Sequence, residues 1–540
     1  MARTVSIGNQ DFEKMIQRNC FYVDKTGFIK EWWENEDEVT LITRPRRFGK
    51  TLNMSMLKCF FSNKYADRGE LFEGLEIWED EKYREIQGTY PVIFFSFAKI
   101  KQTTYKETIE KIKKIIFDLY QEYAFIGKWN GLTDKEKENF NNISYDMSDV
   151  IAQEAIVDLS NYLSRYYGKK VIILLDEYDT PMQEAYVNGY WEELVAFTRS
   201  LFNSTFKTNP YLERAIMTGI TRVSKESIFS DLNNLKVITV TSDEYSKCFG
   251  FTEDEVFAAL EEQGLSSEKE KVKLWYDGFT FGESRDIYNP WSITNYLDKK
   301  EFKTYWADTS SNSLVGKLIQ RGSPKIKKAM EKLLNGEYIT VGIDEQIVFD
   351  QLDNDEDAIW SLLLASGYLK VDSMDICVST GEQKYELSLT NLEVRVMFQK
   401  LIKGWFGRTN GASDEFVDAL LNGDIKAMNY YMNKIALATF SYFDVGNKPS
   451  EYIEPERFYH GFVLGLMVGQ REDYAIKSNR ESGFGRYDVV MEPLKADLDA
   501  IVMEFKVQNI TKEKSLEQTV ENALRQIEEK QYEADMIAAG

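Results

Sequence analysis

Two hydrophobic periods alternate along the first 250 residues of this chain. Short runs of apolar, mostly β-branched or aromatic residues predict buried strands, and these runs cover residues 39–43, 91–97, 170–177, 212–218 and 236–241. Between them, apolar residues three or four positions apart predict helices, over 50–60, 103–123, 149–167 and 190–206, after two lead-in helices at 11–18 and around Trp32. Five strands that alternate with helices predict a parallel sheet covered on both faces, in an α/β fold.

The pattern changes between residues 300 and 450. Helices are predicted over 323–334, 353–366 and 391–406, the second of them amphipathic, and two strands over 368–371 and 384–389. Helix, hairpin and helix in this order are typical of a winged-helix-like unit. Such a unit binds DNA or packs against its neighbours, and the acidic residues at its edge favour packing. They are Asp353, Asp355, Glu356 and Asp357. A linker is predicted over residues 446–455.

The last 90 residues predict a helix over 456–467 and strands over 474–478, 486–491 and 499–507, the last two paired as a hairpin. A turn centred near Ala496 places Asp488 directly opposite Glu504, about 5 Å away across the strands. Glu504 and Lys506 share a face, because side chains alternate along a strand. Two carboxylates and one lysine therefore gather on one face of otherwise apolar strands.

Buried charges are costly unless a partner compensates them, and a divalent cation would do so here. Asp488 and Glu504 are candidate Mg²⁺ ligands, and Lys506 would position or activate an attacking water. Asp, then Glu-x-Lys, on a hairpin is the signature of the PD-(D/E)XK nuclease superfamily. Glu456, on the preceding helix, is a further candidate ligand. The alternative is a half-exposed hairpin with a Glu–Lys pair.

A second candidate site follows the first strand of the sheet. Strand 39–43, the loop Arg44-Pro-Arg-Arg-Phe-Gly-Lys-Thr51 and a helix have the layout of a phosphate-binding loop. Backbone N–H groups at a helix N-terminus attract phosphate, Lys50 would reach the β- and γ-phosphates, and Thr51 would ligate Mg²⁺. The candidate nucleotide-binding residues are Arg46, Arg47, Phe48, Gly49, Lys50, Thr51 and Leu52.

One position departs from the usual phosphate-binding loop. Arg44 stands where the motif has glycine, and with Arg46 and Arg47 it is expected to make the loop basic, which suits a phosphate. A residue with a Cβ resists the positive φ that glycine permits. The alternative is a basic loop before an ordinary helix.

A pair of carboxylates ends the strand at 171–175. Ligands bind at the carboxyl ends of strands in open α/β sheets, so we expect Asp176 to hold Mg²⁺ through water and Glu177 to orient or deprotonate the attacking water. The alternative is a solvated acidic turn, with Asp179 and Pro181 as turn residues. Thr218, at the end of the next strand, is a candidate γ-phosphate sensor. Arg222 is a candidate arginine sensor or finger, with a surface salt bridge as the alternative.

The composition of the chain argues against several classes of protein and of metal site. The chain has 540 residues, enough for roughly three domains, and we expect boundaries at 1–250, 251–450 and 451–540. Four dispersed cysteines and one histidine argue against a structural zinc site, a multi-histidine metal site and a Ser-His-Asp hydrolase. A net charge of −22 counts against sequence-independent coating of DNA. No apolar run approaches a membrane span, so we expect a cytoplasmic protein.

Several motifs together resemble the bacterial and archaeal family called AAA-ATPase-like. They are Phe21-Tyr-Val-Asp-Lys-Thr26, residues 41–52, Leu175-Asp-Glu-Tyr-Asp-Thr-Pro181, Trp275-Tyr-Asp-Gly-Phe279 and Tyr288-Asn-Pro-Trp-Ser292. The resemblance covers residues 5 to about 310. It implies a P-loop NTPase sheet followed by a helical lid, and it implies that the arginine-rich loop is the family's own form.

Segments 458–466, 478–488 and 504–506 resemble the nuclease-like domain that commonly follows the ATPase-like domain in this family, a restriction-endonuclease-like α/β fold. The resemblance places Gln526 and Tyr532 near the active site. His460 matches the family motif, with a packed helix histidine as the alternative. The family's fold usually continues with another strand after the last helix, whereas this sequence stops at Gly540, which leaves the completeness of the nuclease core open.

These observations lead to two hypotheses. In the first, ATP and Mg²⁺ bind at the loop, and ATP binding or hydrolysis switches access of a nucleic acid to Asp488, Glu504 and Lys506. In the second, the chain is a non-catalytic nucleotide-binding regulatory protein with a degenerate nuclease fold. Both are compatible with a homo-oligomer, and neither requires a membrane.

Overall fold

The computed structural model describes residues 2–207, 209–222, 228–229 and 232–309, and, with gaps, 315–431 and 473–537. The chain divides into two compact units. Unit 1 comprises Met1–Leu318 and Asn335–Val394, and unit 2 comprises Ile319–Leu334 and Arg395–Gly540. No helix among the described residues is both long and apolar enough to cross a membrane.

A five-stranded parallel sheet forms the centre of unit 1, as the sequence predicts. Its strands are β1 (Val39–Thr43), β2 (Val92–Ser96), β3 (Val171–Asp176), β4 (Leu212–Gly219) and β5 (Leu235–Ile238). The order is β2-β3-β4-β1-β5, and every neighbouring pair is parallel. β1 and β3 are buried at every position, because both of their faces are covered. The carboxyl ends of β1, β3 and β4 therefore meet at one edge.

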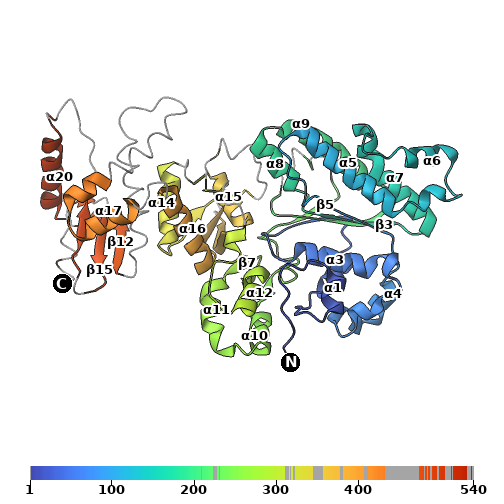
Figure 1. Ribbon diagram of the computed structural model, residues 1–540, viewed down its shortest axis with the longest axis horizontal. Helices are drawn as coiled ribbons and strands as arrows, with labels where there is room; N and C mark the ends of the chain where they lie inside the picture. The colour runs from blue at the N-terminus through green and yellow to red at the C-terminus, as the bar shows by residue number, and fades with distance from the viewer. Residues whose placement is uncertain are drawn as a thin grey trace. The chain divides into compact units, whose positions relative to one another are not determined.

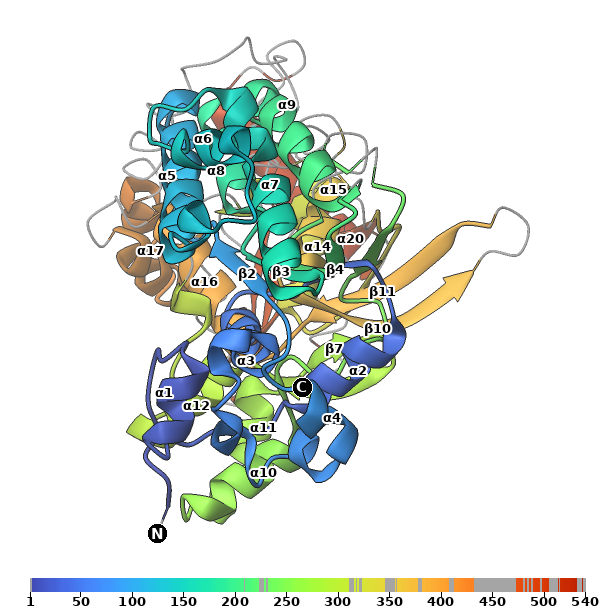
Figure 2. The same cartoon turned by 90° about the vertical axis from the view of Figure 1, so that its right-hand side faces the viewer.

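Helices cover both faces of this sheet (Figure 1). α3 (Lys50–Phe61) lies on one face, with the lead-in helix α1 (Phe12–Gln17) and helix α4 (Glu81–Ile86) on the same side. The second lead-in helix, α2 (Gly27–Asn35), lies on this side as well (Figure 2). On the other face lie α5 (Tyr105–Glu122), α6 (Asp134–Asn141), α7 (Asp149–Tyr167), α8 (Thr180–Asn188) and α9 (Trp191–Phe202). The helix predicted over 190–206 ends at Phe202 and continues as a π-helical turn, Asn203–Lys207.

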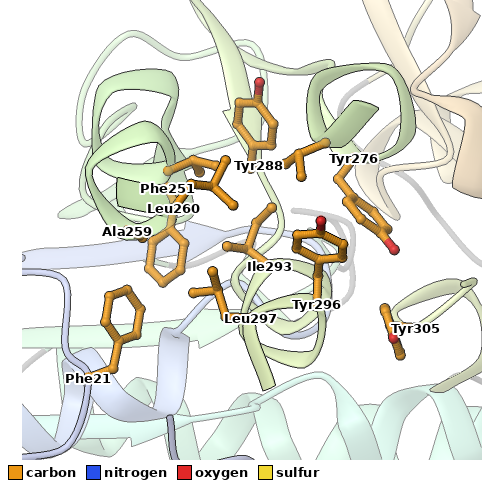
Figure 3. Packing of buried hydrophobic residues seen from close by; sticks show 12 residues of the cluster. Phe21, Phe251, Ala259, Leu260, Tyr276, Tyr288, Ile293, Tyr296, Leu297 and Tyr305 are labelled. Carbon is orange, nitrogen blue, oxygen red and sulfur yellow. The ribbon is translucent and has the colours of Figure 1, made fainter. Parts of the chain in front are cut away.

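Residues 251–299 form a helical region around a small sheet. It contains α10 (Glu253–Glu262), α11 (Lys269–Tyr276) and α12 (Pro290–Lys299), with strands β6 (Phe251–Thr252), β7 (Phe279–Phe281) and β8 (Ser284–Tyr288) in the order β6-β8-β7. Its core is rich in tyrosine, and Phe21 of the lead-in reaches into it (Figure 3). Lys25 also forms an ion pair of 2.7 Å with Glu255. The motif at residues 21–26 thus fastens the lead-in to the helical region.

The winged-helix-like part contains one strand more than the sequence predicts. Strands β10 (Leu369–Ile376) and β11 (Gln383–Leu389) pair as the expected hairpin, which extends away from its neighbours in Figure 2, and β9 (Ile339–Val341) adds to β11. The amphipathic helix over 353–366 is wrong in extent and in character. Helix α15 covers Ala358–Ala365, after Asp357, and its residues from 358 to 364 are all buried. Because these residues are buried on every side, the helix presents no polar face to solvent.

Unit 2 contains helices α14 (Pro324–Leu334), α17 (Ala412–Leu421) and α20 (Leu516–Lys530), with most of α16 (Leu392–Phe406). Strands β12 (Tyr474–Ser478), β15 (Val489–Pro493) and β16 (Ile501–Met503) form an antiparallel sheet, and β13 (Glu481–Ser482) pairs with β14 (Gly485–Arg486). Val489 pairs with Met503, and Met491 with Ile501, which confirms the hairpin register. The predicted linker over 446–455 and helix over 456–467 lie outside the described residues.

Three carboxylates of the helical region crowd together. Ligand oxygens of Glu253, Asp277 and Asp286 lie within 4.8 Å of one another, and Lys273 pairs with Glu253. Burial and the hydrogen bond with Asp286 raise the pKa of Asp277 to about 7. An aspartate in an unfolded chain titrates near ~4. The folded state therefore holds this proton more tightly, and the stability it contributes at low pH is lost as the pH rises from about 4 through 7.

Asp277→Asn should weaken this pH dependence, since asparagine keeps the hydrogen bond without a charge. Between pH 5 and pH 8 the native chain should lose about 1–2 kcal/mol more unfolding free energy than the variant, a value reduced for partial exposure. Urea unfolding at both pH values measures this difference. Glu270→Gln, at an exposed carboxylate of α11, is the control and should follow the native chain. Parallel curves for Asp277→Asn and the native chain would contradict the assignment.

Candidate functional site

The loop after β1 turns without the expected glycine. Arg47 and Gly49 adopt left-handed backbone conformations, with φ of 64° and 82°, whereas Arg44 has no positive φ. Gly49 is the N-cap of α3. A Cβ there would meet no atom within 4 Å, so its conformation, rather than space, favours glycine. The turn that directs backbone N–H groups toward the start of α3 is made at residues 47 and 49, and arginine at 44 is compatible with it.

The Arg44 side chain corrects one expectation. Its guanidinium is fully buried, donates to the carbonyls of Thr43 (2.9 Å) and Thr239 (2.6 Å), and lies 4.6 Å from the ring centre of Phe281. Burial lowers the pKa of Arg44 to about 10. The expectation that Arg44 makes the loop surface basic is therefore wrong, because its charge faces the protein interior. Arg46 and Arg47 are exposed.

Lys50 and Thr51, although adjacent in sequence, donate hydrogen bonds to different acceptors. The Lys50 ammonium donates to the carbonyls of Arg44 and Pro45, each at 2.8 Å, and burial lowers the pKa of Lys50 to about 8. The Thr51 hydroxyl donates to Oδ2 of Asp176 at 2.8 Å. The start of α3 therefore meets the acidic end of β3, although β4 lies between β1 and β3 in the sheet. Leu52, also a candidate, is half-buried in the first turn of α3.

Asp176 is the centre of the acidic turn. Its Oδ1 accepts from the Thr218 hydroxyl at 2.7 Å, while its Oδ2 accepts from Thr51. Asp176 is fully buried, and burial raises its pKa. Glu177 has a φ of 52°, a costly conformation for a residue with a side chain, and its Oε2 accepts from Thr180 at 3.2 Å. The alternative of a solvated acidic turn is wrong, because Asp176 and Asp179 are both fully buried.

Asp179 binds the backbone beyond β4, a role that the sequence did not reveal. Its Oδ2 accepts from the N–H groups of Ile220 (2.9 Å) and Thr221 (3.0 Å), just beyond β4. The acidic turn and the segment that leads to Arg222 are thus joined. Arg222 is half-buried and lines a small pocket with Thr43, Thr241 and Ser361. Within the described residues Arg222 forms no ion pair.

The motif at residues 288–292 and Trp306 lie against the loop. The Asn289 side chain donates to the Arg46 carbonyl at 3.3 Å, and the Trp306 indole N–H donates to the same oxygen at 3.0 Å. The Arg47 guanidinium lies 4.4 Å from the ring centre of Trp291. The motif at residues 288–292 therefore holds the backbone and one side chain of the loop.

Phe48 anchors the loop from its other side. Its ring is buried and packs edge-on against Phe279 at 4.7 Å and Phe281 at 5.3 Å between ring centres. Phe279 is the last residue of the motif at 275–279. Phe48 can therefore offer a ligand only its backbone N–H, whereas the side chains of Arg46 and Arg47 face solvent.

These groups fit a nucleotide with a divalent cation. The Thr51 hydroxyl and the Asp176 carboxylate are hard oxygen donors of the kind that Mg²⁺ prefers, and they already converge within 2.8 Å. The N-terminus of α3, a helix of 12 residues, favours an anion through its N–H groups and its dipole.

Only part of the nuclease-like site lies within the residues that the structure describes. Glu504 follows β16, and the Gln526 side chain of α20 donates to its Oε1 at 2.7 Å. The sequence placed Gln526 near this site. The pairing of Val489 with Met503 has the register from which the sequence predicts Asp488 opposite Glu504. The other residues predicted there lie outside the described residues. They are Asp488, Lys506, Glu456, His460 and Tyr532.

Comparison with known proteins agrees with both the ATPase-like and the nuclease-like region of the chain. A family model described as predicted AAA-ATPase matches residues 6–229, and the model of the PD-(D/E)XK nuclease superfamily matches residues 454–540. An uncharacterized protein in the vnfD 5' region of Azotobacter chroococcum mcd 1 is 26% identical over 405 residues, which are 74% of this chain and 70% of that protein. Residues 6–229 of this chain are thus a domain of the predicted AAA-ATPase family, and residues 454–540 belong to the PD-(D/E)XK nuclease superfamily.

Proposed function

We propose that this chain binds and hydrolyses ATP at its N-terminal domain, and that the nucleotide state controls a metal-dependent nuclease site in its C-terminal domain. In this proposal residues 1–250 bind the nucleotide, 251–450 connect the two activities, and 451–540 act on DNA or RNA. A cytoplasmic location and assembly with further copies of the chain belong to the same proposal.

The convergence of Lys50, Thr51, Asp176 and Thr218 carries the ATP part. These side chains come from three segments distant in sequence, and they gather where parallel strands end beside the N-terminus of α3. Ligands of open α/β sheets bind at this place. A buried carboxylate that meets a P-loop threonine is also the arrangement that a phosphate-bound cation requires.

Each residue of the loop site receives a role. Loop N–H groups and Lys50 would hold the phosphates, with Lys50 exchanging the carbonyls of Arg44 and Pro45 for phosphate oxygens. A divalent cation held by Thr51 and Asp176 would neutralise phosphate charge. Glu177 would orient or deprotonate the attacking water. Thr218 and Arg222 would respond to the γ-phosphate from the end of β4.

The nuclease part rests on Glu504 and its hairpin. Asp488 and Glu504 would hold a divalent cation, with Glu456 as a further ligand, and the cation would offset charge on the cleaved phosphate. Lys506 would position the water. The contact between Gln526 and Glu504 supports this assignment, because it fixes the orientation of the carboxylate.

A second candidate function is nucleotide binding without turnover, with the nuclease fold used for partner binding. The net charge of −22 favours it, since a nuclease must attract a polyanion. The Lys50 ammonium, held by two carbonyls of its own loop, is compatible with either function. The three experiments below separate the two.

Lys50→Ala should abolish stabilisation by ATP–Mg²⁺. At about 100 times its dissociation constant the ligand should add about 2.7 kcal/mol to the native chain, a rise of about 2–4 °C in Tm. Thermal unfolding with and without ligand measures the shift. Lys58→Ala, at the far end of α3, is the matched control and should keep it. An equal shift in Lys50→Ala would place the nucleotide elsewhere.

Glu177→Gln should separate binding from turnover. The amide keeps the size of the side chain but cannot accept a proton, so phosphate release should fall by about 10²–10⁴-fold while the thermal shift with ATP–Mg²⁺ persists. Steady-state phosphate release, with the thermal shift as the binding control, tests this. If the native chain binds ATP without releasing phosphate, the non-catalytic function is correct.

Glu504→Ala should abolish Mg²⁺-dependent loss of DNA or RNA, because it removes a candidate metal ligand. Gln526→Ala should reduce the rate less, since it only frees the orientation of Glu504. Gel assays on single- and double-stranded substrates, with EDTA as a blank, measure the loss. Glu492→Ala removes a carboxylate from β15 that pairs with Lys477 and should retain activity. Cleavage that survives Glu504→Ala would contradict the assignment.

A further inference from the structure

One carbonyl of the phosphate-binding loop accepts two hydrogen bonds from residues that follow the sheet in sequence. The oxygen of Arg46 accepts from the Trp306 indole at 3.0 Å and from Asn289 at 3.3 Å. Trp306 is buried and its ring packs against Phe279 and Tyr368, with centres 5.4 Å away in both cases. The donor is therefore held in place by aromatic neighbours on two sides.

A buried carboxylate binds the backbone of Trp306. Glu393 is fully buried. Its Oε1 accepts from the backbone N–H of Trp306 (2.6 Å) and of Ala307 (3.3 Å), and its Oε2 accepts from the Ser292 hydroxyl (2.7 Å). Three donors on one carboxylate fix the segment that carries Trp306, and they compensate the cost of burying a charge.

Glu393 belongs to a helix that is shared by the two units. α16 starts at Leu392, and the boundary between the units falls after Val394. The residue that holds Trp306 therefore lies in the first turn of the helix whose remainder belongs to unit 2. A continuous chain of contacts leads from this turn through Trp306 to the Arg46 carbonyl.

The same loop segment holds the ammonium of Lys50. The carbonyls of Arg44 and Pro45, which accept from Lys50, directly precede that of Arg46. Fixing the Arg46 carbonyl thus restricts the two peptide groups that Lys50 contacts. A loop that is fixed before it meets a ligand loses less conformational entropy on binding.

We propose that Trp306 is a positioning residue for the nucleotide site, that it latches the phosphate-binding loop through the Arg46 carbonyl, and that Glu393 connects this latch to helix α16. The latch rests on the proposed nucleotide binding for its effect on affinity, but its effect on the loop itself does not. Removal of the Glu393 carboxylate would free the segment that carries Trp306 and would thereby loosen the loop.

Trp306→Phe tests the latch, since phenylalanine keeps an aromatic ring but cannot donate to Arg46. Trp32→Phe is the matched control. Trp32 is equally buried in unit 1, and its indole nitrogen has no hydrogen-bond partner among the described residues. Both variants lose a similar volume, so a difference between them reports the missing donor.

Two measurements are made on each variant. Hydrogen–deuterium exchange of the peptide that covers residues 44–50, without nucleotide, should become about three- to tenfold faster in Trp306→Phe and stay unchanged in Trp32→Phe, as expected for one lost hydrogen bond. The dissociation constant for ATP–Mg²⁺ should rise by a similar factor in Trp306→Phe alone. Glu393→Ala should reproduce both effects, and Glu393→Gln, which keeps one acceptor oxygen, should restore part of them.

The outcomes separate the latch from the proposed nucleotide binding. Unchanged exchange in Trp306→Phe, or equal changes in Trp32→Phe, would overturn the latch even if the native chain binds ATP. Faster exchange together with no ATP binding by the native chain would support the latch as a property of the loop and overturn the proposed function. Faster exchange with unchanged affinity would overturn the positioning role.

Discussion

The carboxylate of Asp176 ties together the candidate ATP site. One of its oxygens accepts from Thr51, at the start of α3, and the other accepts from Thr218, at the end of β4. A buried carboxylate without such donors would be costly, so the ends of the central strands and the loop are held in one arrangement. The candidate roles of Lys50 and Glu177 depend on that arrangement.

The helical region gives the loop the rigidity that glycine-rich loops obtain from their own compact turns. Phe48 is inserted between Phe279 and Phe281, and the carbonyl of Arg46 is bound from outside. The family motifs downstream of the sheet are thus parts of the loop's surroundings. This explains why residues more than 200 positions apart in the sequence occur together as one signature.

The sequence predicted the elements that repeat a simple pattern. Strands β1 to β5 follow from apolar runs, and the register of Val489 with Met503 follows from the placement of a single turn. Contacts made by unusual side chains could not be predicted. Nothing in the pattern indicates that Arg44 points inward or that Asp179 binds the backbone beyond β4, because each depends on partners that only the fold supplies. The short strand β9 was missed because three residues carry no period.

The buried guanidinium of Arg44 has a consequence for substitutions at this position. Restoring the common glycine at this position would leave the carbonyls of Thr43 and Thr239 without their donor and would open a cavity beside Phe281. The substitution of Arg44 by glycine should therefore destabilise the chain unless the residues around it change as well. Arginine at position 44 is thus part of the loop's internal packing, and it cannot be exchanged independently of the residues that surround it.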